Sequence, residues 1–367
     1  MKVLHIITRM NTGGPAVFLD HLTQSMADLG TKSTIAYGYC ESNETDYTEN
    51  NLMGAELVKI EALHRTLNPV DDIKAFLQLR RVVKTLKPDV INTHTSKAGV
   101  LGRIAIATII PKPKVVHTFL GHLIYGYFSK VKVWIFISIE KVMAKFTSVA
   151  IAVSFETKQS LVNKGVGRKL RWEVIRIGIP VCKPRMNALS QGSRIKILWV
   201  GRFTDIKDPT FAVDTMKELS KKMPGNFELT MVGGGELFEE VVSLAVNLPI
   251  TFTGVLKNPF ETIQNFDLLM VTSKNEGLPL VILESANCFR ATISTNVGGI
   301  SEFIRDNNNG YLVPRDVKLM AEKIIFLAQH KEILHELGLN ARRTLESRFS
   351  DKQMAQLHYD LYSSLIV

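Results

Sequence analysis

Short apolar runs alternate with longer stretches of helical periodicity along the first half of the chain. Near-continuous apolar runs separated by amphipathic stretches are typical of parallel strands whose connecting helices cover both faces of a sheet. The pattern therefore predicts a doubly wound α/β domain. The expected strands are residues 2–8, 33–39, 57–60, 89–95, 114–120 and 148–154.

The second half repeats this pattern, which predicts a second Rossmann-like sheet. Its expected strands are residues 195–201, 227–233, 250–254, 266–272, 292–297 and 310–314. Residues 180–193 hold two prolines, a glycine and no periodicity, as expected of a linker. We predict domains over residues 1–180 and 181–350, and a final helix over residues 351–367 that crosses back to the first domain.

The length of 367 residues supports two domains, because single hydrophobic cores rarely keep growing to this size. Open parallel sheets bind ligands beyond the carboxyl ends of their strands. Two such domains that face one another would therefore hold a substrate in the cleft between them. No secretion signal is recognisable, and the longest apolar runs fall far short of the roughly 20 residues of a membrane span. We expect a cytoplasmic protein.

The net charge of +10 belongs entirely to the first half. Residues 1–180 contain 24 Lys and Arg against 14 Asp and Glu, whereas the remaining residues contain equal numbers of each sign. Nucleic acid, an anionic membrane surface or a pyrophosphate-bearing substrate would each suit this asymmetry. The three cysteines are far apart and form no CxxC pair, so neither a disulfide framework nor a zinc site is expected.

A glycine pair, Gly13 and Gly14, joins the first strand to a helical stretch. Glycines there allow backbone amides to approach a phosphate at the start of a helix, although a plain strand-to-helix turn explains them equally well. The chain has no GxGxxG or Walker A pattern, which weakens dehydrogenase and NTPase interpretations.

Two histidines, His117 and His122, lie at the carboxyl end of the strand over residues 114–120. Either could contact a ligand hydroxyl in a cleft, and the alternative is a hydrogen-bonded structural histidine. Metal ligation by the pair is not expected, because no third ligand lies nearby in the sequence.

Two cations, Arg202 and Lys207, share the loop after the strand that begins at Ile195. A guanidinium and an ammonium suit a diphosphate and would stabilise the charge on a departing nucleotide. The alternative is a solvated loop whose charges are offset by Asp205 and Asp208.

The segment over residues 273–285 is the most specific pattern in the chain. Glu276 lies in a loop after an apolar strand, Pro279 suits the first turn of a helix, and Glu284 follows within that helix. The loop amides from Gly277 to Leu280, which include Leu278, are expected to point toward an anion. The alternative is an ordinary helix start with Glu284 on a solvated face. A further glycine turn follows at residues 295–302.

Together these motifs resemble the retaining glycosyltransferases of family four, the group 1 glycosyl transferases with GT-B architecture. The resemblance covers nearly the whole chain, and its strongest element is the pair of glutamates around the GluGlyLeuPro segment. It implies two Rossmann-like domains that face one another across an interdomain cleft. Residues 1–180 would form the acceptor domain and residues 181–350 the nucleotide-sugar-binding domain.

The resemblance also implies roles for individual residues. Glu276 and His117 would contact the transferred sugar as catalytic residues. The implied donor-binding residues are Gly14, Arg202, Lys207, Gly277, Leu278, Pro279, Leu280 and Glu284. Within this set, Arg202 and Lys207 would bind the diphosphate and Glu284 the ribose. The family retains anomeric configuration and usually needs no metal, and this chain contains no DxD pair.

Three positions depart from the family pattern. Asp208 follows Lys207 where glycine is frequent, residues 287–292 lack a common glycine and proline, and Leu120 stands where histidine is often found. These departures affect loop shape and donor preference more than the paired glutamates.

The expected donor is a UDP-sugar, and the expected acceptor is a glycan or polyprenyl-linked saccharide of bacterial surface polysaccharide synthesis. Residues 125–146 mix lysines with aromatic residues and could rest on an anionic inner membrane, or form an ordinary core helix. Lys97 and His122 are weaker acceptor candidates. The competing readings are a nucleotide-sugar epimerase of similar plan and a non-catalytic GT-B binding subunit. Nucleic acid is not an expected partner.

Overall fold

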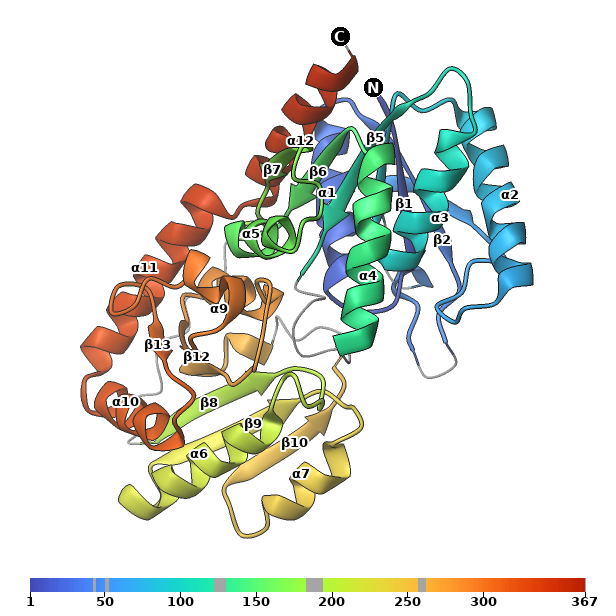
Figure 1. Cartoon of the computed structure of the whole chain (residues 1–367). Helices are drawn as coiled ribbons and strands as arrows, with labels where there is room; N and C mark the ends of the chain where they lie inside the picture. Colours follow the sequence, from blue (N-terminus) through green and yellow to red (C-terminus); the bar gives the residue numbers. More distant parts are fainter. Residues whose placement is uncertain (42–43, 50–52, 122–129, 183–193, 257–261, 367) are drawn as a thin grey trace. The chain divides into compact units, whose positions relative to one another are not determined.

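A computed structural model describes residues 1–41, 44–49, 53–121, 130–182, 194–256 and 262–366 (Figure 1). The described chain forms two compact units. Unit 1 combines the residues up to Pro180 with the C-terminal segment that begins at Ser350, and unit 2 contains the chain from Val181 to Phe349. His122 lies outside the described residues.

Unit 1 is a seven-stranded parallel sheet in the order β3-β2-β1-β4-β5-β6-β7. Its strands are β1 (Lys2–Arg9), β2 (Lys32–Gly38), β3 (Ala55–Lys59), β4 (Val90–His94), β5 (Lys114–Phe119), β6 (Val149–Ala152) and β7 (Arg171–Val174). Its helices are α1 (Gly14–Asp28), α2 (Pro69–Leu86), α3 (Ser96–Ala107), α4 (Lys130–Met143), α5 (Phe155–Asn163) and α12 (Asp351–Ile366), with short 3₁₀ turns η1 (Tyr47–Glu49) and η2 (Ala144–Phe146).

Unit 2 is a six-stranded parallel sheet in the order β10-β9-β8-β11-β12-β13. Its strands are β8 (Ile195–Val200), β9 (Phe227–Val232), β10 (Ile250–Gly254), β11 (Leu268–Val271), β12 (Ala291–Thr295) and β13 (Tyr311–Val313). Its helices are α6 (Pro209–Lys222), α7 (Phe238–Leu244), α9 (Leu280–Asn287), α10 (Val317–Gln329) and α11 (Lys331–Arg348), with a 3₁₀ turn η3 (Gly298–Glu302).

Burial on both faces of the sheets explains why the apolar runs predicted strands. In β1, Leu4 and Ile6 point to one face and Val3 and Ile7 to the other, and all four are buried. Helices on both faces exclude water from such strands, so alternation with polar residues is not needed. The two predicted parallel sheets are thus confirmed, whereas the edge strand β7 was not predicted, because its four residues are partly or fully exposed.

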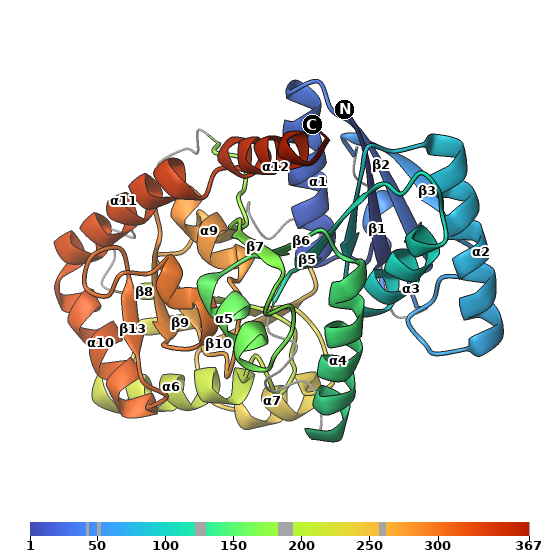
Figure 2. The ribbon, with the colours of Figure 1, turned by 45° about the horizontal axis from the view of Figure 1, so that its top comes forward.

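The C-terminal helix α12 packs against α1 of unit 1 (Figure 2). Ser25 of α1 donates a hydrogen bond to the Asp351 carboxylate over 2.7 Å, and the Asn92 amide donates to the Tyr362 hydroxyl over 2.7 Å. The final segment is therefore part of unit 1 although it follows unit 2 in sequence. No helix in the described part of the chain is long and apolar enough to cross a membrane.

Three histidines are buried in the interior of unit 1. They are His5 of β1, His94 of β4 and His358 of α12 itself. His5 and His94 are hydrogen-bonded over 3.2 Å, and Phe18 contacts the rings of His94 and His358. Burial lowers the pKa of His5 to about 3 and that of His358 to about 4, and it holds the pKa of His94 well below its usual value. The interior therefore requires neutral imidazoles.

Candidate functional site

Three loops at the carboxyl edge of the unit 2 sheet lie against one another. They follow β8, β11 and β12 and span residues 201–208, 272–279 and 296–297. Parallel strands end at the same edge of a sheet, so loops far apart in sequence meet there. This edge collects most of the residues that were predicted to bind a donor.

Lys207 and Glu276 form an ion pair between the first two of these loops. The same Glu276 oxygen accepts a hydrogen bond from the Ser273 hydroxyl over 2.6 Å. Lys207 and Glu276 are both largely buried, which strengthens their attraction relative to an exposed pair. Two residues that are 69 positions apart, each predicted from its own motif, are therefore brought together.

Backbone contacts fix this pair in place. The Thr272 hydroxyl lies within hydrogen-bonding distance of the Lys207 carbonyl, at 3.0 Å, and the Lys274 amide donates to the Ile206 carbonyl over 2.8 Å. The Gly299 amide donates to the Glu276 carbonyl over 3.0 Å. Gly298 has a φ of 57°, and a Cβ there would lie 1.8 Å from the Glu276 carbonyl oxygen. Glycine is therefore required at position 298, where the turn over residues 295–302 packs against the backbone of Glu276.

The loop that carries Glu276 leads into α9, with Pro279 as its N-cap. The backbone N–H groups of Gly277 and Leu278 make no hydrogen bond within the described part of the chain. The first turn of α9, which begins at Leu280, also leaves N–H groups without intrahelical partners. These donors and the helix dipole together favour an anion at this end of α9.

Glu284 lies further along α9 and is half-buried, and its carboxyl has no hydrogen-bond partner among the described residues. Burial raises the pKa of its carboxyl to about 7. The group is therefore close to half-protonated near neutral pH. A half-buried carboxylate in this state gains stability from hydroxyl donors supplied by a ligand.

Arg202 is exposed after β8 and forms no ion pair within the described residues. The adjacent loop of three glycines, Gly233–Gly235, was not singled out in the sequence. The Phe203 amide donates to the Gly234 carbonyl over 2.9 Å, and a Cβ on Gly233 would lie 1.9 Å from the Gly201 carbonyl oxygen. A run of three glycines after a predicted strand was the signal that could have identified this loop.

In unit 1, Gly14 is the first residue of α1 and is exposed, with Gly13 as the N-cap. No acidic side chain occupies the first turn of α1. The first turn therefore carries no acidic side chain that would repel an anion, and the phosphate contact of Gly14 stays a prediction.

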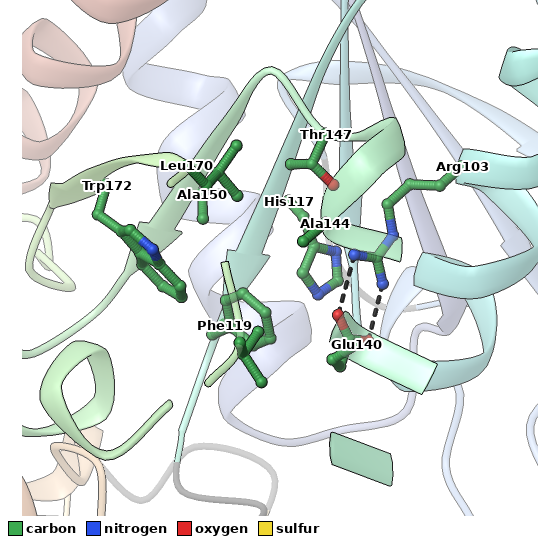
Figure 3. A pocket seen from close by; sticks show the side chains of 10 residues that line it. Arg103, His117, Phe119, Glu140, Ala144, Thr147, Ala150, Leu170 and Trp172 are labelled. Atoms are coloured by element: carbon green, nitrogen blue, oxygen red, sulfur yellow. Dashed lines mark hydrogen bonds and ion pairs between the residues drawn. The ribbon is translucent and has the colours of Figure 1, made fainter. Parts of the chain in front are cut away.

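His117 does not lie at an open ligand site. Its ring is 2% exposed, its Nδ1 is 2.8 Å from the Thr93 hydroxyl, and its pKa is held well below the usual value by burial. It lies beside the buried ion pair of Arg103 and Glu140, with N–O distances of 2.8 and 2.9 Å (Figure 3). A Cβ on Gly99 would be 2.6 Å from its Cε1. These contacts favour the structural histidine that the sequence left open as the alternative, and the sugar contact stays a prediction.

Lys97 is also engaged within unit 1. Its Nζ forms an ion pair with the Asp72 carboxylate over 2.5 Å and donates a hydrogen bond to the Thr66 carbonyl over 2.5 Å. The contacts join the start of α3 to α2. The structure thus places Lys97 in a contact between α3 and α2, and its role as an acceptor or phosphate contact stays a prediction.

Two family models match most of the chain. The model described as Glycosyltransferase Family 4 matches residues 12–181, and that described as Glycosyl transferases group 1 matches residues 194–330. The chain is 24% identical over 341 residues to the UDP-Gal:alpha-D-GlcNAc-diphosphoundecaprenol alpha-1,3-galactosyltransferase of Escherichia coli, covering 88% of this chain and 87% of that protein. It is also 24% identical over 355 residues to a Campylobacter jejuni alpha-1,4-N-acetyl-D-galactosaminyltransferase whose named acceptor is a saccharide on PP-undecaprenol, covering 94% and 93% of the two chains.

Solved structures with the same fold include Anabaena Alr3699/HepE in complex with UDP-glucose. It has a TM-score of 0.80 at 18% identity, covering 99% of this chain and 100% of that one. The sucrose-phosphate synthase of Thermosynechococcus elongatus has a TM-score of 0.84 at 19% identity, covering 100% and 99%. These similarities identify the fold of both units together as GT-B.

Proposed function

Because the chain belongs to the group 1, family four glycosyltransferases, we propose that it is a retaining, metal-independent transferase of a hexosyl or N-acetylhexosaminyl group. The proposed donor is a UDP-sugar, and the proposed acceptor is a polyprenyl-linked saccharide of bacterial surface polysaccharide synthesis. The observation that carries the proposal is the pairing of Lys207 with Glu276 beside the open start of α9.

The donor diphosphate is proposed to bind at this edge of unit 2. Lys207, Arg202 and the free amides of Gly277 and Leu278 supply positive charge and hydrogen-bond donors for it. Glu284, whose carboxyl has no hydrogen-bond partner in the part of the chain that the structure describes, is proposed to accept hydrogen bonds from the ribose hydroxyls. Gly14 of unit 1 is proposed to bind a phosphate group through its backbone amide.

Glu276 is proposed to bind the hydroxyls of the transferred sugar while Lys207 stabilises the departing diphosphate. In the proposed step the bond from the sugar's anomeric carbon to the diphosphate oxygen breaks. The acceptor oxygen forms its bond on the same face, and its proton passes to the departing diphosphate. Positive groups fixed near that oxygen stabilise its developing charge without reorganisation. Glu276 need not act as a nucleophile in this scheme.

The proposed acceptor rests on the relatives, two of which are named for saccharides linked to undecaprenol diphosphate. Such acceptors lie in a membrane, so the enzyme is proposed to work at the cytoplasmic face of the inner membrane. Helix α4 offers a surface that fits this location.

One face of α4 is apolar and exposed to solvent. Val131, Trp134 and Val142 are 66%, 69% and 50% exposed, and Ile135 and Ile139 lie beside them. Their spacing of three to four residues gathers them along one side of the helix. Ile137 and Glu140 are buried on the opposite side. An ordinary core helix is apolar only on its buried face, whereas α4 also has an exposed apolar face.

The exposed charges described on and after α4 are positive. They are Lys132, Lys141 and Lys145, whereas Glu140 is buried and paired with Arg103. An apolar stripe with lysines at its flanks suits the interface of an anionic bilayer. We propose anionic phospholipid as the surface that α4 contacts.

A transfer assay tests the proposed activity. The enzyme is incubated with labelled UDP-sugars and a polyprenyl-diphosphate-linked saccharide in the presence of EDTA, and the product's anomeric configuration is read by NMR. We expect transfer with retention, lowered about 100-fold or more by Glu276→Gln, which keeps the size but not the charge. Conversion of the donor without acceptor would favour the epimerase reading, and donor binding without turnover would favour a binding subunit.

A further inference from the structure

Asp208, the residue after Lys207, holds a backbone conformation that glycine normally occupies. Its φ and ψ are 47° and 62°, in the left-handed region. An L-residue meets steric strain there, whereas glycine does not. Since Lys207 belongs to the proposed donor site, contacts that hold Asp208 in this conformation also orient its neighbour.

The Asp208 carboxylate uses both oxygens. One accepts hydrogen bonds from the Thr210 hydroxyl, over 2.7 Å, and from the Phe211 amide at the start of α6, over 3.3 Å. The other oxygen pairs with the guanidinium of Arg315. The carboxylate is therefore fixed from two sides.

Arg315 follows β13 and extends to the loops after β8 and β11. Its Nη2 donates to Asp208, and its Nη1 donates to the carbonyl of Thr272 over 3.2 Å. The guanidinium also lies over the ring of Phe211, 5.4 Å from its centroid. The planar fork of an arginine can bridge two such acceptors, and a lysine cannot reproduce both contacts.

Thr272 completes the link between these loops. Its hydroxyl lies 3.0 Å from the carbonyl of Lys207 and 2.9 Å from that of Asp208, and it accepts a hydrogen bond from the Trp199 indole over 2.9 Å. Arg315 thus contacts both loops that supply the Lys207–Glu276 pair.

We propose that Arg315 is a positioning residue for donor binding, which holds Asp208 in the left-handed conformation and so keeps Lys207 directed at Glu276. This inference rests on the proposed function. Within the described residues Arg315 makes no hydrogen bond or ion pair with the Lys207 or Glu276 side chains, and it acts through Asp208 and Thr272.

The inference predicts a specific rescue. In Arg315→Gln the Asp208 carboxylate loses its ion-pair partner, and the strained loop can relax away from Glu276. In Asp208→Gly the loop keeps its conformation without an ion pair, and glycine is also an accepted N-cap. The double variant Asp208→Gly/Arg315→Gln should therefore bind nucleotide better than Arg315→Gln alone.

The test is calorimetric titration of UDP into wild type, the two single variants and the double variant, with melting temperatures measured alongside. We expect Arg315→Gln to weaken UDP binding about tenfold, and Asp208→Gly and the double variant to weaken it less than about threefold. The UDP affinity of Arg315→Lys should lie between those of wild type and Arg315→Gln. If Arg315→Gln does not fold, Arg315→Lys takes its place in the comparison. Arg343→Gln, at an exposed arginine on α11, is the control and should bind as wild type does.

Equal UDP affinity of Arg315→Gln and wild type would overturn the inference and leave the proposed function intact. A double variant as weak as Arg315→Gln would also overturn it, because a role in stability alone predicts no rescue by glycine. A wild type that binds none of UDP, GDP and ADP would overturn the proposed function as well.

Discussion

At the scale of single residues, the site depends on carboxylates in contrasting environments. Glu276 is held by Lys207 and Ser273, so its charge is compensated in the free protein. Glu284 is half-buried with no such partner, and its pKa is raised to about 7. One carboxylate is therefore fixed in the free protein, whereas the other has no carboxyl partner among the described residues.

The raised pKa of Glu284 has a consequence for stability. A carboxyl whose pKa is higher in the folded state than in the unfolded state favours folding at low pH, and that contribution is lost as pH rises from about 4.5 to about 7. We predict that Glu284→Gln melts at a higher temperature than wild type at pH 8 and at a similar temperature at pH 4.5. Thermal unfolding at the two pH values checks this, with Glu336→Gln, at an exposed glutamate, as control. A lower melting temperature for Glu284→Gln at pH 8 would contradict it.

The residues that the sequence located well are those whose motif sits directly after a strand. Lys207 and Glu276 were found from separate motifs, because parallel strands deliver their following loops to one edge. Arg315 and Ser273 were missed, since a single arginine after a short strand or a serine in a loop has no distinctive spacing. The burial of His117 was not predicted, because its position in the strand does not reveal the packing of α3 and α4 around its ring.

At the scale of elements, strands were predicted better than the surfaces of helices. Buried parallel strands are apolar throughout, which the sequence displays directly. In α4 the apolar run over residues 133–137 favoured burial, yet the structure leaves Trp134 and Ile135 exposed and buries Ile137. Only the packing partners of a helix decide which of its apolar sides faces solvent.

The exposed face of α4 predicts binding to anionic vesicles. We expect wild type to cosediment with vesicles that contain phosphatidylglycerol, more weakly at high salt, and poorly with phosphatidylcholine alone. Trp134→Glu/Val142→Glu should reduce binding about tenfold or more, because two charges would enter the interface. Val246→Glu, at a valine of unit 2 that is equally exposed, is the control and should bind as wild type does.

Vesicle binding that Trp134→Glu/Val142→Glu leaves unchanged would contradict the proposed contact of α4 with the membrane. Absence of vesicle binding, together with a concentration-dependent dimer that Trp134→Glu/Val142→Glu abolishes, would instead assign the face to a second copy of the chain.

Docking of α12 depends on neutral histidines, which predicts sensitivity to acid. His5, His94 and His358 have folded pKa values below that of an unfolded histidine, so their contribution to stability is present above about pH 6.5 and is lost as pH falls. For His5 and His358 the loss is complete only below the folded pKa values of about 3 and about 4. Besides burial, the neighbouring imidazoles lower these pKa values, since His358 acts on His5 and both act on His94.

Amide hydrogen exchange between pH 7 and 5, corrected for the intrinsic rate, checks this prediction. We expect protection in α12 to fall steeply with acid and protection in α10 of unit 2 to change less. Equal changes in the two helices would contradict a specific role of the histidines.

At the scale of the whole molecule, the chain divides chemically as well as structurally. Residues 1–180 carry all of the excess positive charge. Unit 2 carries Glu276, Glu284 and the start of α9. The sequence predicted two doubly wound sheets and a boundary near residue 180, because periodicity and linker composition are local signals. It could not predict how contacts between distant residues neutralise some candidate groups and leave others open.

Donor binding by unit 2 through Lys207 and Glu284, without a metal ion, is the property on which the proposed function depends. It is tested by measuring protection against thermal unfolding by UDP-, GDP- and ADP-sugars in EDTA, on wild type, Lys207→Ala and Glu284→Ala. We predict that a UDP-sugar raises the wild-type melting temperature, since ligands that bind the folded state stabilise it, and that each substitution reduces the shift. No shift with any donor in EDTA, or a shift that both substitutions leave intact, would contradict it.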